Sequence, residues 1–290
     1  MTTSRDEFIK VLMWSVSAAD DYRLKGGKLV EATYSNQLIN DKLAQIPYGL
    51  DLLSGIHSYT QSSLDNYFSL RMLTLPQGPP VLGSSGNIDF NLTISGCSTL
   101  LRQFLEGAVY ANWLLEVENS REVTERGFAF YWANLTERLK YERALESPKI
   151  DFYSNLKNEA IASGTSLDLL NFWEDGKKCE PKIKIDDATG KLREIEFNIS
   201  FPDELIRLLG SGFKNGSWLY HWLSGLTHGL SWAHFDNSQM ESEVELVERN
   251  PDLMRFAHAA LFGMQLFQEI FPKLDHSFEN KLCSPSFTVS

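Results

Sequence analysis

The sequence STLLRQFLEGAVYANWLLEVE, residues 98–118, is the clearest helical segment of the chain. Its apolar residues recur at spacings of three and four and wrap most of the helical circumference. A helix that is apolar on most sides must be covered by neighbours, so we expect it near the centre of a helical bundle. Two charges interrupt this surface, Arg102 and Glu106, and their spacing of four residues puts them on one face. In a central helix they must compensate each other, because an unpaired buried charge costs several kcal/mol.

The same apolar spacing predicts further helices on both sides of this segment. Their predicted ranges are 5–22, 29–46, 62–74, 121–146, 151–164, 166–174, 203–209, 217–234 and 250–271. The run Lys25-Gly26-Gly27-Lys28 is expected to end the first of them, because glycine is a poor helix former. Beyond Pro272 the sequence becomes polar, which predicts a frayed tail over residues 273–290.

The apolar period changes from helical to alternating between Lys182 and Ser200. Ile183 and Ile185 alternate with charged residues, and a turn sequence ending in Gly190 follows them. This pattern predicts a β-hairpin. The predicted fold is therefore mainly α: a single domain over residues 1–290, with a core bundle at about 50–272 and a small hairpin insertion near 182–200.

Composition limits the class of protein. Of the 290 residues, 43% are hydrophobic and 12% aromatic, enough apolar material for a core. The chain holds 27 basic and 38 acidic residues, a net charge of −11. This charge excludes a broad DNA-binding surface but leaves a local basic groove open. The N-terminal residues have no signal-peptide pattern, and no apolar run reaches the length of a membrane span. We therefore expect a soluble protein of the cytoplasm that does not bind membranes.

A second polar line crosses the otherwise apolar helix predicted at 217–234. His221, Ser224 and His228 follow one another at spacings of three and four, and Tyr220 precedes them. Gly225 lies three residues before His228 and Gly229 directly after it, so a ligand could approach the imidazole closely. If this helix faces residues 98–118, Glu106 could orient the His228 imidazole while Arg102 presents an anion-binding fork. A buried network that only fixes helix register is the alternative interpretation of the same residues.

Metal and cofactor chemistry is not predicted. The three cysteines, Cys97, Cys179 and Cys283, form no Cys-x-x-Cys pair, and the sequence contains no His-Glu-x-x-His motif. His221 and His228 lie about two helical turns apart, roughly 10 Å along the axis, which is awkward for one ion. The sequence also contains no phosphate loop, dinucleotide-binding fingerprint or nucleophile elbow.

Two segments resemble a known family. Residues 101–115 resemble a helix of the form R-x-x-x-E followed by W-L-L, and residues 220–229 resemble a Y-x-x-x-S-x-x-x-H-G helix. Together they are similar to bacterial all-helical proteins of unknown function that look HEPN-like, over about residues 50–145 and 203–236. The resemblance implies a bundle whose polar centre comes from those two helices. HEPN relatives include metal-independent ribonucleases of toxin–antitoxin and antiphage systems, whose signature is an arginine followed by a histidine on one helix. Here His228 has no arginine in that window, so Arg102 would have to supply the guanidinium from another helix.

Three functions are therefore considered. The first is a HEPN-like defence, stress or toxin factor that acts on RNA, with His228 as general acid–base, Arg102 stabilising the phosphate and Glu106 holding the imidazole tautomer. In this interpretation Ser224, His221 and Tyr220 contribute to binding. The second is a non-catalytic sensor of a small anionic ligand. The third is an interaction module in which the polar cluster is structural, and a homodimer is one expectation for such a bundle.

Overall fold

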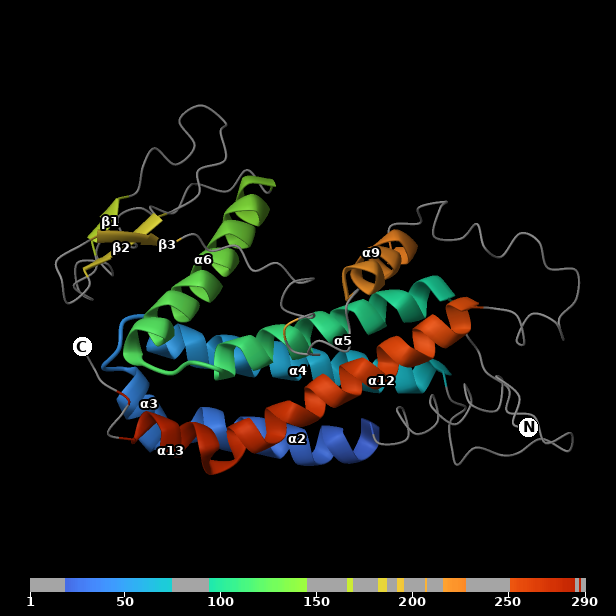
Figure 1. The fold of residues 1–290 in the computed structure, drawn as a ribbon, viewed down its shortest axis with the longest axis horizontal. Coiled ribbons are helices and arrows are strands. Elements are labelled where there is room, and N and C mark those ends of the chain that lie inside the picture. The colour runs from blue at the N-terminus through green and yellow to red at the C-terminus, as the bar shows by residue number, and fades with distance from the viewer. Residues whose placement is uncertain are drawn as a thin grey trace, which may run out of the picture. The chain divides into compact units, whose positions relative to one another are not determined.

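The structure is a computed structural model. Most of the residues that it describes belong to helices (Figure 1). The described residues are 19–74, 94–144, 166–168, 182–186, 192–195, 207, 216–227, 251–284 and 287. The helices are α2 (Ala19–Ser35), α3 (Gln37–Leu43), α4 (Gly49–Thr74), α5 (Ile94–Leu115), α6 (Ser120–Ala144), α9 (Gly216–Thr227), α12 (Pro251–Pro272), the π-helix η2 (Lys273–Ser277) and α13 (Phe278–Leu282). The predicted mainly α fold is confirmed. None of the described helices has the length and apolarity that a membrane span requires.

The chain divides into two compact units, each built from separated segments. Unit 1 comprises Met1–Thr33, Ile56–Leu115 and Ser200–Phe278, and unit 2 comprises Tyr34–Gly55, Glu116–Ile199 and Glu279–Ser290. The predicted single domain stays a prediction. Each unit is described by itself.

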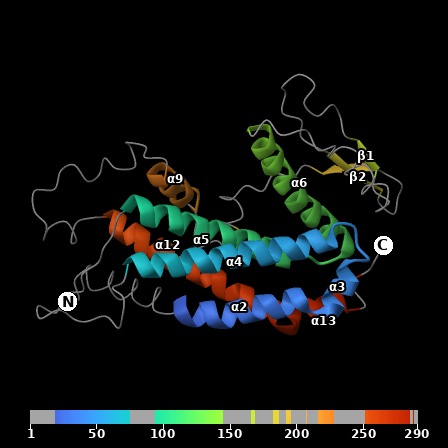
Figure 2. The same ribbon diagram turned by 180° about the vertical axis from the view of Figure 1, so that it is seen from behind.

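Helix α5 forms the centre of unit 1, as its wrapped apolar pattern predicts. Its residues Leu101, Phe104, Leu105, Ala108 and Val109 are fully buried. Helices α9 and α12 pack against it, and Figures 1 and 2 show α4 running alongside.

Three helices of unit 1 meet at the aromatic ring of Phe104. This ring stacks on that of Tyr67 from α4, with centroids 4.6 Å apart and planes 9° from parallel. It also contacts Phe267 of α12, at 5.9 Å between centroids. Such ring pairs add to the free energy gained by burying the apolar surface.

The glycine pair at Gly26 and Gly27 does not end a helix, contrary to the sequence prediction, and α2 runs through both residues. Gly26 lies against α12 and α4, where an added Cβ atom would stand 2.6 Å from Phe271 Cε1 and 3.4 Å from Leu64 Cδ2. The glycine therefore permits close helix packing. The interruption falls instead at Asn36, whose side chain accepts hydrogen bonds from the first backbone N–H groups of α3.

The segment after Pro272, predicted as a frayed tail, is helical over most of its length. Leu274, Phe278 and Leu282 are buried, and this apolar spacing of four residues continues the helical pattern of α12. Lys273 is held by the side chain of Asn112 on α5. Burial of these three side chains explains why a polar sequence remains ordered.

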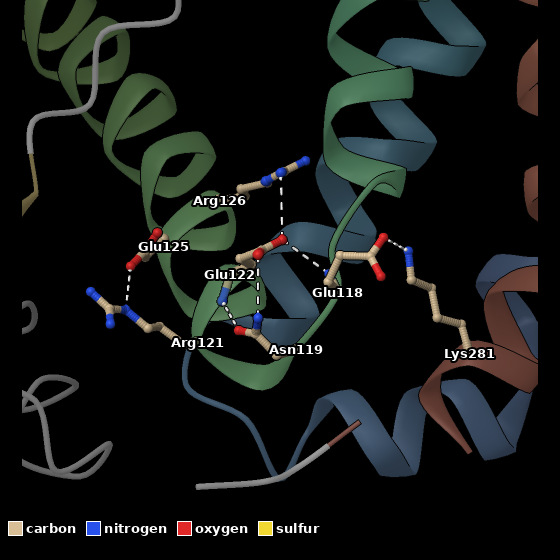
Figure 3. Close-up of polar contacts among 7 residues, drawn as sticks. All are labelled: Glu118, Asn119, Arg121, Glu122, Glu125, Arg126 and Lys281. Atoms are coloured by element: carbon tan, nitrogen blue, oxygen red, sulfur yellow. Dashed lines mark hydrogen bonds and ion pairs between the residues drawn. The ribbon is translucent and has the colours of Figure 1, made fainter. Parts of the chain in front are cut away.

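A polar network surrounds the N-terminus of α6 in unit 2 (Figure 3). The Asn119 Oδ1 atom accepts a hydrogen bond from the Glu122 N–H at 3.0 Å, and Glu122 accepts in turn from the Glu118 N–H at 3.0 Å. Lys281 of α13 pairs with the Glu118 carboxylate at 2.7 Å. These contacts supply partners for backbone donors that have none inside the helix, and they tie the C-terminal helix to the start of α6.

Three short strands in unit 2 form an antiparallel sheet with the order β1-β2-β3. They are β1 (Ser166–Asp168), β2 (Lys182–Asp186) and β3 (Leu192–Ile195). Strands β2 and β3 lie in the segment predicted as a hairpin, and its predicted turn at 187–190 is outside the described residues. Strand β1, predicted to begin a short helix, instead pairs with β2. The spacing of apolar residues gave the wrong prediction for β1, because the strand that pairs with it lies some fifteen residues further along the chain.

Candidate functional site

Arg102 and Glu106 form an ion pair on α5. The Arg102 Nε atom donates to Glu106 Oε1 at 2.8 Å, and the two side chains are 19% and 27% exposed. Charge-assisted bonds of this length are among the stronger ones in proteins. The pair compensates both charges on a helix that is largely buried, as the spacing of four residues predicts.

Helix α9 brings a third polar group to this pair. Its residues Trp222, Leu223 and Leu226 are buried, and α9 packs on α5. Ser224 is half-buried, and its Oγ atom accepts a long hydrogen bond, 3.4 Å, from Arg102 Nη1. Ser224, one residue of the predicted polar line, therefore contacts the polar pair of α5, and the functional interpretation depends on this contact.

The other predicted site residues belong to α9 or follow it in sequence. His221 is exposed on α9. Tyr220 belongs to α9, but its side chain is outside the described residues. His228 directly follows Thr227, the last residue of α9, and is itself outside the described residues. The structure thus brings together Arg102, Glu106 and Ser224.

Tyr59 is a member of this cluster that sequence reasoning missed. The helix predicted from residue 62 begins at Gly49 in the structure, so Tyr59 lies within α4. Gly107 of α5 lets the two helices approach closely, since a Cβ atom there would stand 2.8 Å from the Tyr59 carbonyl oxygen. Burial, and to a smaller extent the nearby Glu106 carboxylate, raise the pKa of the Tyr59 phenol above its usual 10.0. The phenol is therefore neutral at physiological pH and remains protonated further into the alkaline range.

Tyr110 extends the cluster along α5. It lies four residues after Glu106, and its ring contacts that of Tyr59 with centroids 5.0 Å apart and planes 37° from parallel. The i, i+4 spacing from Glu106 is a signal that could have identified Tyr110. No local pattern links Tyr59 to it, because the two tyrosines are about fifty residues apart.

The cluster is suited to binding an anion. The guanidinium is oriented by the Glu106 carboxylate and the Ser224 hydroxyl, and its side chain retains access to solvent. An oriented arginine fork of this kind recognises phosphate and carboxylate groups. Among the described residues, no group of three or more His, Cys, Asp or Glu side chains could hold a metal ion.

A second buried polar cluster in unit 1 centres on Asn112. Its Nδ2 atom donates to the carbonyl oxygens of Ala108 at 2.9 Å and Leu266 at 2.7 Å, while Oδ1 accepts from Lys273 Nζ at 2.7 Å. Asn112 is fully buried, and the amide has a partner for each of its polar atoms. We interpret this cluster as a structural tie between α5, α12 and η2.

No protein-family model, curated protein or solved structure matches this chain.

Proposed function

We propose that this chain is a HEPN-like factor that acts on RNA, with the phosphate bound at Arg102 and His228 serving as general acid–base. The observation that supports it is the hydrogen bond between Arg102 and Ser224, which brings the charged face of α5 to α9. In sequence His228 follows Ser224 by four residues, the spacing at which helical side chains share a face. An imidazole there would complete the pair of groups that the family resemblance implies.

The proposed reaction needs no metal. His228 takes the proton of an RNA 2′-hydroxyl, and the 2′ oxygen attacks the adjacent phosphorus. The bond from phosphorus to the 5′ oxygen breaks, and the imidazolium returns the proton to that leaving oxygen. The products are a 2′,3′-cyclic phosphate and a 5′-hydroxyl end. Arg102 stabilises the charge on the phosphorane, and Glu106 fixes the guanidinium through Nε in addition to its expected role toward the imidazole.

The test is cleavage of RNA by the purified full chain with a chelator present throughout. We expect products that end in 2′,3′-cyclic phosphate, with the rate reduced at least a hundredfold in His228→Ala, because general acid–base groups contribute factors of about 10² to 10⁴. The control is His57→Ala, which removes a half-buried histidine of α4 and should leave the rate unchanged. Absence of cleavage, or equal cleavage by the wild type and His228→Ala, contradicts the proposal.

A structural role for the cluster is the second candidate, and one observation favours it. The Arg102 guanidinium already has protein partners in Glu106 and Ser224, as in a network that fixes the packing of α5 against α9. In that case Glu106→Gln lowers the melting temperature, and neither RNA nor a panel of nucleotides shifts it in the wild type. A thermal shift with a nucleotide but no cleavage would instead indicate the small-ligand sensor. The defence or toxin setting, the cytoplasmic location and a homodimer remain predictions.

A further inference from the structure

We propose that Tyr59 and Tyr110 form a nucleobase platform at the end of the α5 face that carries Arg102, so that the substrate is single-stranded RNA whose base stacks there while a nearby phosphate binds the guanidinium. The inference rests on the proposed function and specifies its substrate class. It is argued from the contact between the two tyrosine rings, from the position of Tyr110 on the α5 face that carries the Arg102–Glu106 pair, and from the proximity of Tyr59 to the Glu106 carboxylate.

The spacing of the three α5 residues suits a nucleotide chain. Arg102, Glu106 and Tyr110 are each four residues apart and lie along one helix face. Eight residues of helix rise about 12 Å, a span that a short single strand bridges between a phosphate and a neighbouring base. Tyr59 adds its ring to this line from α4, in contact with the ring of Tyr110.

The two rings are more exposed than the aromatic rings at the centre of unit 1, although they are not the only half-buried rings of that unit. Tyr67 stacks on Phe104, which also contacts Phe267, and all three side chains are fully buried. Tyr59 and Tyr110 are only half-buried, so part of their ring surface is accessible. Partly exposed aromatic rings on the same helix face as an oriented guanidinium are a combination that binds single strands, since stacking holds the bases while positive charge holds the backbone.

Charge and strand geometry restrict the ligand further. A phenol is neutral at physiological pH, and burial and the Glu106 carboxylate raise the pKa of Tyr59 further, so the Tyr59 ring adds no negative charge that would repel a phosphate. A base in an A-form duplex is stacked between its neighbours and offers no free face. The platform should therefore discriminate against double-stranded RNA.

The experiment separates binding from cleavage. The probe is a fluorescent, single-stranded 2′-O-methyl oligonucleotide, which lacks the attacking hydroxyl, and its affinity for the full chain is measured by anisotropy. The same oligonucleotide is tested with abasic positions and as a duplex. The variants are Tyr110→Leu, which removes the ring, and Tyr110→Phe, which keeps it. Tyr141→Leu is the matched control, since it removes an exposed tyrosine of α6. Circular dichroism establishes that each variant is folded.

We expect Tyr110→Leu to weaken binding about 5- to 100-fold, because stacking contributes about 1–3 kcal/mol per base and 1.4 kcal/mol is a factor of ten. Tyr110→Phe and Tyr141→Leu should stay within about twofold of wild type. The duplex and the abasic strand should bind the wild type about as weakly as the normal strand binds Tyr110→Leu. Equal affinity for abasic and normal strands would overturn the platform, even if RNA is cleaved. Stacking-dependent affinity without any cleavage would support the platform and contradict the proposed catalysis. Absence of binding by every strand would overturn both.

Discussion

Replacement of Gly107 by alanine is the most direct test of how the site is assembled. Gly107 lies inside α5, where an added Cβ atom would stand 2.8 Å from the Tyr59 carbonyl oxygen and 3.1 Å from Ser63 Cβ. The nearest of these atoms belongs to the backbone of α4, so no flexible side chain can move away from the new methyl group. The two helices must separate by a few tenths of an ångström, and Tyr59 moves away from Glu106 when they do.

The expected loss of stability follows from three contributions. Alanine in place of glycine favours an α-helix by about 1 kcal/mol. Overpacking of a close helix contact costs about 1–3 kcal/mol. Separation of the helices also weakens the buried hydrogen bond from Ser63 Oγ to the Phe104 carbonyl, 2.8 Å long, a loss of about 1 kcal/mol. Gly107→Ala should therefore lower the free energy of unfolding by about 1–3 kcal/mol.

Gly27→Ala is the matched control, since it is also a helical glycine but has no atom within 4 Å of an added Cβ. It should raise stability by about 1 kcal/mol, so the two variants should differ by about 2–4 kcal/mol. Urea denaturation followed by far-UV circular dichroism measures both free energies. If Gly107→Ala is as stable as Gly27→Ala, then α4 and α5 do not approach closely at this point and the placement of Tyr59 beside Glu106 is wrong.

Three further predictions concern buried polar groups of unit 1. A double-mutant cycle of Asn112→Leu and Lys273→Met should give a coupling energy of about 1–2 kcal/mol, because Lys273 Nζ donates a charged hydrogen bond of 2.7 Å to Asn112; additive effects would mean that this bond contributes nothing. Trp222→Phe should cost no more than about 1 kcal/mol, since the packing lost with the smaller ring is offset by removal of a buried Nε1 donor that has no hydrogen-bond partner among the described residues; a loss of about 3 kcal/mol or more would contradict an unsatisfied donor. The pKa of Tyr59 is raised in the folded chain, so the folded state holds the phenolic proton more tightly than the unfolded state does. The free energy of unfolding of the wild type should therefore fall faster above pH 10 than that of Tyr59→Phe. If the urea midpoints of the two proteins change equally between about pH 9 and 11.5, the pKa of Tyr59 is not raised in the folded chain.

Errors of the sequence prediction arose where a residue acts through distant neighbours. Gly26 was expected to end a helix because glycine is intrinsically unfavourable there, yet it lies where Phe271 of α12 leaves no room for a Cβ atom. The polar sequence after Pro272 predicts a frayed tail, but the segment is helical because three apolar side chains at spacings of four residues, Leu274, Phe278 and Leu282, are buried. In both cases packing against other segments outweighed the local preference.

Properties that depend on spacing along one helix could be predicted from the sequence. The apolar repeat of residues 98–118 predicts a buried central helix, and the spacing of Arg102 and Glu106 predicts their ion pair, because both depend on the fixed rise and rotation of an α-helix. The contacts of Arg102 with Ser224 on α9, and of Tyr110 with Tyr59 on α4, join residues far apart in the chain. They depend on how closely helices pack, which in turn depends on small residues such as Gly107 and on the shapes of the buried side chains. Local spacing carries no information about those distances, so the site as a set of neighbours became visible only in the folded chain.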